Sequence, residues 1–214
     1  MADEAPKSDA LLVRAAAGDG AAWGSLLAGQ QERLTRMVAF RMDARLRGRI
    51  DAVDIVQDAF AEASEHRAEY FRAPTVPPFL WLRGVVINKM LEIHRHHLGT
   101  RMRDVKRELP LDAAWSWDDT SAALCEQLTG HLTSPSVAAI RVEVKTRLAE
   151  ALDKMNAIDR EVLALRHFEQ LTSAEAAQVL GIQEPAASKR YLRALERLKQ
   201  ILSEMPGGLT EVRP

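Results

Sequence analysis

The chain has 214 residues, of which 47% are hydrophobic and 28% are charged, and its formal net charge is −1 at pH 7. Only 5% are aromatic, while Ala, Leu, Arg and Glu are abundant, so we expect an all-α protein. The single Cys125 excludes an intramolecular disulfide and a cysteine-based metal site, which makes a reducing cytoplasm the expected location. The polar start MADEAPKSDA lacks the apolar core of a secretory signal, and no run of about eighteen apolar residues follows, so we expect no membrane span.

An acidic stripe occupies the segment 51–66, which reads DAVDIVQDAFAEASEH. Its carboxylates recur at steps of three and four, so at helical pitch they share one face: Asp51, Asp54, Asp58, Glu62 and Glu65. No Lys or Arg lies among them, and the opposite face is apolar, formed by Val53, Val56, Phe60 and Ala63. Like charges one turn apart repel by a few tenths of a kcal/mol. The stripe is therefore either a solvated face that tolerates this repulsion or a surface for a basic partner.

A basic block follows in the segment 89–107, where basic residues outnumber acidic ones. The basic residues are Lys89, Arg95, Arg101, Arg103, Lys106 and Arg107. Such cations can neutralise nucleic-acid phosphates, a salt-sensitive interaction that carries no sequence information by itself. His94, His96 and His97 lie in the same block, but adjacent histidines face different ways and no carboxylate or thiolate completes a ligand set. We therefore expect no metal and no cofactor.

The charge pattern divides the chain into two domains. The segment 108–139 contains carboxylates and prolines but no Lys or Arg, which is typical of an acidic linker, and strong helical periodicity resumes after it and ends at MPGG. We predict two small helical domains joined by a flexible acidic linker. The predicted boundaries are a disordered N-terminus at 1–10, a first domain at 11–107, the linker at 108–139, a second domain at 140–205 and a tail at 206–214.

The sharpest local pattern is LTSAEAAQVLGIQEPAASKRYLRALERLKQIL in the second domain. Thr172 and Glu175 have the spacing of a capping box, and Gly181 suits the left-handed end of the short helix that the box begins. Pro185 suits the first position of the next helix, because its missing N–H would be unpaired there anyway. These signals predict a helix, a glycine turn and a second helix.

The second of these helices is amphipathic. Its predicted apolar face consists of Ala187, Tyr191, Ala194, Leu195, Leu198, Ile201 and Leu202. The face across from it is basic and consists of Lys189, Arg190, Arg193, Arg197 and Gln200. This arrangement indicates a helix-turn-helix whose second helix enters the major groove of DNA. The alternative is an ordinary helical hairpin with a solvated basic face.

Two stretches of the chain match one known family independently. MNAIDREVLALRHFEQLTSAEAAQVLGIQEPAASKRYLRALERLK resembles the C-terminal promoter-reading domain of bacterial sigma factors, in particular the small extracytoplasmic-function (ECF) group. GDGAAWGSLL, DAVDIVQDAFAEASEH and FLWLRGVVINKMLEIHR follow the order and approximate spacing of the same group's core-binding and melting domain. The resemblance covers 11–107, as sigma domain two, and 142–202, within sigma domain four. It implies a non-catalytic transcription initiation factor that binds core RNA polymerase, directs it to promoters and helps open the DNA.

The resemblance also implies three sets of site residues. Those in the segment that docks on the polymerase clamp are Asp51, Asp54, Gln57 and Asp58. Those on or after the helix that contacts the minus-ten element are Asn88, Lys89, Glu92, Arg95, His96, Arg101 and Arg103. Those on the helix that reads the minus-thirty-five element are Ser188, Lys189, Arg190, Arg193 and Arg197.

The implied partners are core RNA polymerase, through its clamp coiled coil and flap, and promoter DNA, with an anti-sigma factor as a further candidate. The loop 73–78 corresponds to the segment that captures an unstacked base, and the acidic linker to the segment that threads the polymerase toward the RNA exit path. Phe79 and Trp81 could stack on bases, but packing in the core is the more common role of such aromatics.

The chain departs from the family pattern at three places. The loop 73–78, which reads APTVPP, is rich in proline, and proline stiffens it. The reading helix begins with Pro185, Ala186, Ala187 and Ser188 where Gly-Thr-Val-Lys is usual, so fewer polar groups face the bases at its tip. Asn156 stands where a proline is common, and it can cap the helix that follows.

Two other classes of protein were weighed. A helix-turn-helix regulator that binds DNA alone, of the response-regulator type, would show alternating strands and helices in its other half, and the first hundred or so residues do not show this pattern. The motifs GxxxxGK, GxSxG and HExxH are absent from the sequence, which argues against an enzyme.

Overall fold

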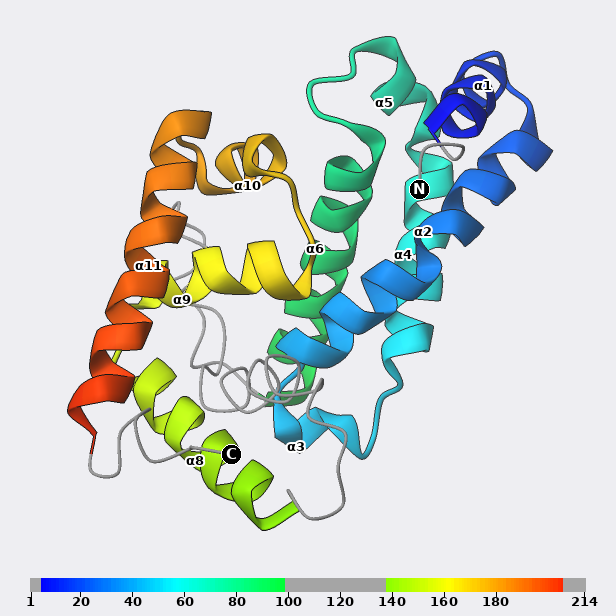
Figure 1. The fold of residues 1–214 in the computed structure, drawn as a ribbon. Coiled ribbons are helices and arrows are strands. Elements are labelled where there is room, and N and C mark those ends of the chain that lie inside the picture. Colours follow the sequence, from blue (N-terminus) through cyan, green and yellow to red (C-terminus); the bar gives the residue numbers. More distant parts are fainter. Residues whose placement is uncertain (1–4, 99–137, 206–214) are drawn as a thin grey trace. The chain divides into compact units, whose positions relative to one another are not determined.

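We describe the chain from a computed structural model, which defines the backbone of residues 5–98 and 138–205. The described residues form helices and turns without a strand, so the prediction of an all-α protein is confirmed. The chain divides into two compact units, Met1–Arg101 and Met102–Pro214 (Figure 1). Within the described ranges, no helix is both long enough and apolar enough to cross a membrane. The predicted acidic linker lies almost wholly outside the described residues, as do Cys125, Arg101 and Arg103.

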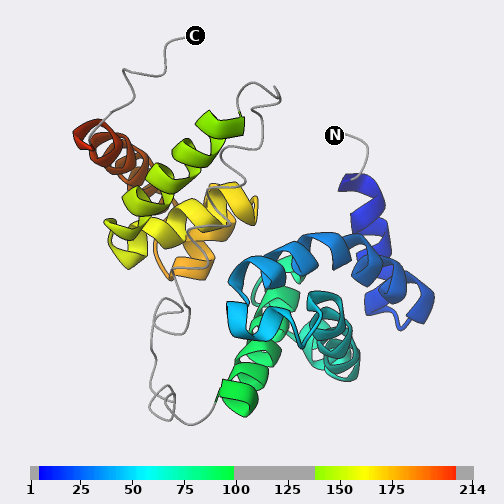
Figure 2. The same cartoon turned by 90° about the horizontal axis from the view of Figure 1, so that it is seen from below.

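The first unit contains six helices in its described part. They are α1 (Ala5–Ala16), α2 (Gly20–Arg41), α3 (Ala44–Arg47), α4 (Ala52–Glu65), α5 (Arg67–Arg72) and α6 (Pro78–Leu98). Helices α2, α4 and α6 pack against one another, and α1 packs against α2 (Figures 1 and 2). Among the side chains that fill this three-helix core are Leu34, Met37, Val38, Ile55, Val56, Leu82, Val86 and Met90.

Helix α1 differs from the sequence prediction, because it begins at Ala5, inside the segment 1–10 that we expected to be disordered. The reason lies in the residues that follow. Ala15 is buried and Leu11 and Leu12 are half-buried, so the second half of α1 has an apolar face that packs on α2. The guanidinium of Arg14 also pairs with the carboxylate of Asp19 at 2.6 Å.

Aspartates begin several of the helices in this unit. Asp19 accepts the N–H groups of Ala21 and Ala22 at the start of α2, and Asp51 accepts that of Val53 at the start of α4. Such caps satisfy N–H groups that have no partner inside the helix.

The buried face of α4 is rotated relative to the predicted one. It consists of Ala52, Ile55, Val56, Ala59 and Ala63. Val53 and Phe60, which we placed on the apolar face, are only half-buried. The difference arises because α4 is covered by two neighbours, α2 and α6, and its apolar face points between them.

The second unit contains four α-helices and one turn of π-helix in its described part. They are α8 (Ala138–Asp153), α9 (Ala157–Leu163), η4 (Ala164–Phe168), α10 (Ser173–Leu180) and α11 (Glu184–Glu204). Helix α11 packs against α8, α9 and α10. Asn156 caps α9 as expected, since its side chain accepts the N–H of Asp159 at 2.8 Å.

The helix-turn-helix signals are confirmed in the second unit. Thr172 and Glu175 form both hydrogen bonds of the capping box, and Gly181 ends α10 in the left-handed region with φ 63°. Pro185 is the second residue of α11, one position later than predicted. The turn is therefore set by local sequence.

A test of the first unit concerns Asp43, the buried cap of α3. Its carboxylate accepts the N–H of Arg45 and two bonds from the Arg45 guanidinium, at 2.6 to 2.9 Å, and the guanidinium bonds are the main reason that the pKa of Asp43 is lowered to about 2. A lowered pKa stabilises the fold above the unfolded value of about 3.9, and this stabilisation is lost as the pH falls through about 2.

We therefore predict that Asp43→Asn, which keeps a good cap but removes the charge, lowers the free energy of unfolding near pH 7. The loss should be about 1 kcal/mol or less, because the Arg45 side chain is 70% exposed and solvent weakens the pair. The difference from the wild type should shrink between about pH 4 and pH 2. Urea unfolding followed by tryptophan fluorescence across this range measures it. A difference that stays constant down to pH 2 would contradict the assignment.

A test of the second unit concerns Gly181. A Cβ added at this position meets no atom within 4 Å, so any cost of Gly181→Ala comes from the backbone conformation and not from a clash. We predict a loss of roughly 1–2 kcal/mol in the stability of this unit, measured by thermal unfolding. Gly181→Asn is the matched control and should lose less, because Asn tolerates the left-handed region. Equal stability of all three proteins would show that the turn can relax.

Candidate macromolecular interfaces

The outer face of α4 carries exposed carboxylates. We use the name acidic face for Asp51, Asp54, Asp58 and Glu65, all of which are exposed. Gln57, the one uncharged residue of the predicted docking set, is also exposed on α4. Asp54 and Asp58 make no ion pair with any residue in the described ranges, whereas one oxygen of Asp51 accepts the Val53 N–H at 2.9 Å. The structure thus brings the four predicted docking residues onto one exposed surface.

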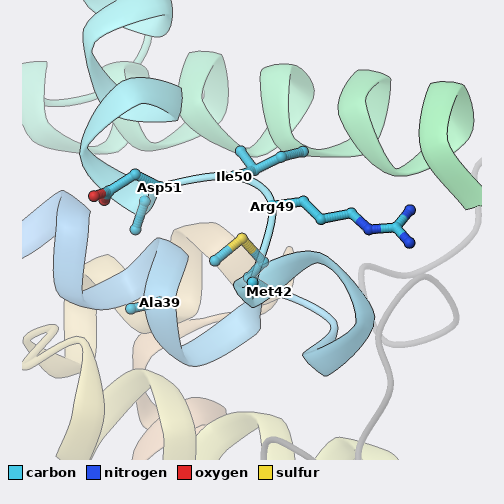
Figure 3. A pocket seen from close by; sticks show the side chains of 7 residues that line it. Ala39, Met42, Arg49, Ile50 and Asp51 are labelled. Atoms are coloured by element: carbon cyan, nitrogen blue, oxygen red, sulfur yellow. The ribbon is translucent and has the colours of Figure 1, made fainter.

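A pocket of about 460 Å³ lies at the N-terminal end of the acidic face (Figure 3). It is lined by Ala39, Met42, Gly48, Arg49, Ile50, Asp51 and Ala52. The side chains of Asp51 and Arg49 extend away from one another in Figure 3. The rim of the pocket is therefore acidic at Asp51 and basic at Arg49. Sequence reasoning missed this pocket, because its lining comes from the end of α2, the α3–α4 connection and the start of α4.

The predicted minus-ten residues divide into two groups on α6. Asn88, Arg95 and His96 are exposed and form no ion pair within the described part of the chain. Lys89 is different, because its side chain is 22% exposed and its ammonium lies 3.0 Å from Glu92 and 3.6 Å from Glu62 of α4. The hydrogen bond with Glu92 raises the pKa of Lys89, and the same bond lowers the pKa of Glu92. Both groups are therefore charged at neutral pH.

An aromatic cluster supports the loop between α5 and α6. Tyr70 stacks on Trp81 with 4.6 Å between ring centroids, and its hydroxyl donates a hydrogen bond to the Val76 carbonyl at 3.0 Å. Burial raises the pKa of Tyr70. Trp23 contacts the edge of Phe71 and donates its indole N–H to Ser64 at 2.9 Å. The proline-rich loop 73–78 is thus held by a hydrogen bond from Tyr70, a residue that the sequence did not indicate as important.

The expectation that Phe79 and Trp81 pack holds in the structure. Phe79 is buried, with the Arg33 guanidinium 3.6 Å from its ring centroid, and Trp81 is covered on one side by Tyr70. Neither ring is fully presented to solvent.

The three histidines of α6 do not converge. His94 is buried, and burial lowers its pKa, whereas His96 and His97 are exposed and meet edge to face at 4.8 Å. Among the described residues, no group of three or more His, Cys, Asp or Glu side chains is arranged to hold a metal ion.

The basic face of α11 contains most of the predicted minus-thirty-five residues. Lys189 and Arg193 are exposed and make no ion pair with a described residue, while Ser188 and Arg190 are half-buried. Arg197 is also exposed, but its guanidinium lies 3.9 Å from Asp159 of α9. Leu192 is 58% exposed between these cations and was missed, because the sequence pattern placed only polar side chains on this face.

The reading helix is fixed to the unit through Tyr191. The hydroxyl of Tyr191 lies 3.0 Å from His167 Nε2, and the Arg166 guanidinium lies 5.4 Å from the Tyr191 ring centroid. Both partners belong to the π-helical turn η4. Burial and the neighbouring Arg166 lower the pKa of His167, so this histidine is neutral at pH 7 and can accept the Tyr191 hydrogen bond.

A capped helix-turn-helix with an exposed basic second helix defines a DNA-binding module. Residues 145–198, which contain it, match the family model "Sigma-70, region 4". The chain is 31% identical to the RNA polymerase sigma factor CnrH of Cupriavidus metallidurans, over 90% of this chain and 92% of CnrH. It is 30% identical to the RNA polymerase sigma factor NccH of Alcaligenes xylosoxydans xylosoxydans, over 91% and 94% of the two chains.

The chain therefore belongs to the RNA polymerase sigma factor family, and it is a transcription initiation factor. Its membership of the ECF group agrees with 27% identity to the ECF RNA polymerase sigma factor SigD of Mycobacterium tuberculosis, over 93% of this chain and 85% of SigD. The structure titled "Structure of CnrH in complex with the cytosolic domain of CnrY" matches with a TM-score of 0.50 and 24% identity, over 90% of this chain and 94% of that one. This match supports the fold.

Proposed function

We propose that the acidic face of α4 docks on a basic surface of core RNA polymerase, the clamp coiled coil, while α6 and α11 contact the minus-ten and minus-thirty-five promoter elements. The observation that carries this division is the opposite charge of two exposed helix faces. Asp54 and Asp58 on α4 form no ion pair within the described residues, and neither do Lys189 and Arg193 on α11. A carboxylate face repels DNA phosphates but complements a basic protein surface and steers the encounter with it.

The minus-ten surface is formed by the exposed side of α6 with the loop that precedes it. Asn88 and Arg95 offer polar groups to bases and phosphates, and Glu92 and His96 lie beside them. The loop is held by the hydrogen bond from Tyr70 to Val76, which orders a segment that would receive an unstacked base. Arg101 and Arg103, outside the described residues, are proposed to extend the phosphate contacts.

In this proposal the protein is a non-catalytic specificity subunit that binds polymerase and promoter in the cytoplasm. The limits of the two domains and the linker are kept as proposed from the sequence, although α1 begins inside the segment 1–10, and the acidic linker of 108–139 is proposed to pass through the polymerase while the second domain contacts the flap. An anti-sigma factor is a further proposed partner, by analogy with CnrH, which has been solved with the cytosolic domain of CnrY.

The polymerase contact is tested by charge reversal on α4. We predict that Asp54→Lys, Asp58→Lys weakens association with core RNA polymerase at least tenfold, about 1.4 kcal/mol or more, because two attractive charges become repulsive. Helicity and thermal stability should be nearly unchanged, since the two side chains are exposed and the substitution relieves a like-charge repulsion. Competition binding to core enzyme measures the affinity, and circular dichroism checks the fold.

The matched control is Glu32→Lys, Glu69→Lys, which makes the same change in net charge at exposed sites on α2 and α5. This control should compete almost as well as the wild type. Wild-type affinity of a well-folded Asp54→Lys, Asp58→Lys protein would show that the acidic face is only solvated, and the docking assignment would fail.

The promoter contact is tested on α11. We predict that Arg193→Ala weakens minus-thirty-five recognition by about 1–3 kcal/mol if the guanidinium bonds a base, and by less if it meets only phosphate. Arg190→Ala should have a smaller effect, because Arg190 is half-buried. Core binding should be retained by both variants. Transcription from a panel of mutated upstream elements measures the preference.

Lys199→Ala serves as the control, since Lys199 is exposed on α11 about one and a half turns beyond Arg193. It should leave the order of preferred promoters unchanged. If neither arginine variant alters promoter strength or preference, α11 is not the reading helix.

A further inference from the structure

The ion pairs of Lys89 connect the two proposed binding surfaces of the first unit. Lys89 belongs to α6, the helix proposed to contact DNA, and its ammonium lies 3.6 Å from Glu62 of α4, the helix proposed to contact polymerase. On its other side the same ammonium donates a hydrogen bond to Glu92 of α6 at 3.0 Å. Glu62 follows the acidic face at the next helical turn after Asp58, but it lies at the edge where α4 meets α6.

Lys89, Glu62 and Glu92 form a triad whose total charge is negative and therefore disfavours the approach of a phosphate. One ammonium and two carboxylates give a net charge of −1, and both carboxylates lie within 3.6 Å of the ammonium, so a phosphate that approaches Lys89 is also repelled by two nearby anions. The Lys89 side chain is 22% exposed, whereas those of Glu62 and Glu92 are 39% and 61% exposed. The anions are therefore more accessible than the cation that they surround.

The ion pairs of Lys89 are weak enough to be replaced by contacts with another molecule. The pairs are partly exposed and join flexible side chains, and such pairs are weak enough for another ion to displace them. A basic polymerase surface on the α4 acidic face would attract Glu62, because Glu62 lies one turn from Asp58. When Glu62 moves away, Lys89 keeps only the Glu92 carboxylate, and the net charge of these side chains changes from −1 to zero.

We propose that Glu62 and Glu92 withhold Lys89 from promoter DNA in the free protein, and that docking of α4 on core polymerase draws Glu62 away, so that Lys89, then balanced by Glu92 alone, can contact a backbone phosphate. The triad is then an internal competitor for DNA that couples polymerase binding to promoter binding. This inference rests on the proposed functions of α4 and α6. It differs from them in assigning Lys89 a conditional role, where the sequence prediction placed Lys89 among the minus-ten residues without such a condition.

The experiment measures how the affinity for promoter DNA depends on salt, by fluorescence anisotropy, for the free chain and for the holoenzyme. Each phosphate contact on duplex DNA adds about 0.9 to the slope of log affinity against log salt. In the free chain, Glu62→Gln, Glu92→Gln should steepen the slope by about 0.9. This change is equivalent to a roughly 3.5-fold greater loss of affinity between about 50 and 200 mM salt.

Three further variants complete the design. Adding Lys89→Ala to Glu62→Gln, Glu92→Gln should abolish the gain in slope, and Lys89→Ala alone should leave the slope of the free chain unchanged. The control Asp9→Asn, Glu69→Gln removes two exposed carboxylates from α1 and α5 without freeing Lys89, and should not change the slope. In the holoenzyme, Lys89→Ala should lower the slope by about 0.9.

The inference is overturned if Lys89→Ala lowers the slope equally in free chain and holoenzyme, because Lys89 would then be always available. It is also overturned if Lys89→Ala has no effect in either, or if the glutamate variants leave the free chain unchanged. Failure of the proposed function is recognised separately, because the wild-type chain would then form no holoenzyme with core polymerase. The slopes of the free chain remain measurable in that case.

Discussion

The packing of α4 between α2 and α6 is the constraint on which both proposed surfaces of the first unit depend. Small alanines at positions 52, 59 and 63 let the helices approach, and Ile55 and Val56 fill the remaining space. Burying an aliphatic side chain of this size contributes about 1.5–3 kcal/mol, whereas each like-charge contact on the outer face costs only a few tenths. The core therefore outweighs the repulsion, and α4 can present an acidic face without losing its place in the fold.

Local signals made much of the second unit predictable. Thr172, Glu175 and Gly181 act within a few residues of one another, so their spacing in the sequence determines the hydrogen bonds and the left-handed turn that the structure contains. The amphipathic pattern of α11 likewise predicted which side is buried, with Ala187, Ala194 and Leu198 inside.

Features that join distant residues were not predictable from the sequence. Glu62 and Lys89 are 27 positions apart, and the Tyr70 hydroxyl bonds the Val76 carbonyl beyond the end of α5, so neither contact follows from periodicity. The rotation of the buried face of α4 has the same origin, because a helix with two neighbours buries the side that points between them. Sequence pattern fixes which residues are charged, but tertiary packing decides which charges are already paired.

That distinction gives the cations of the two units different roles. On α11, Lys189 and Arg193 have no described ionic partner, so phosphate contacts there cost no internal pair. Arg197 of α11 has one long ion-pair contact, 3.9 Å from Asp159. Lys89 of α6, by contrast, is paired with two carboxylates, those of Glu62 and Glu92. The proposed upstream contacts of Lys189 and Arg193 thus need no rearrangement of ion pairs, whereas the proposed contact of Lys89 requires one. The proposed conditional contact thus lies on α6, which packs directly against α4, the helix proposed to dock on polymerase, so that binding of one partner can alter binding of the other.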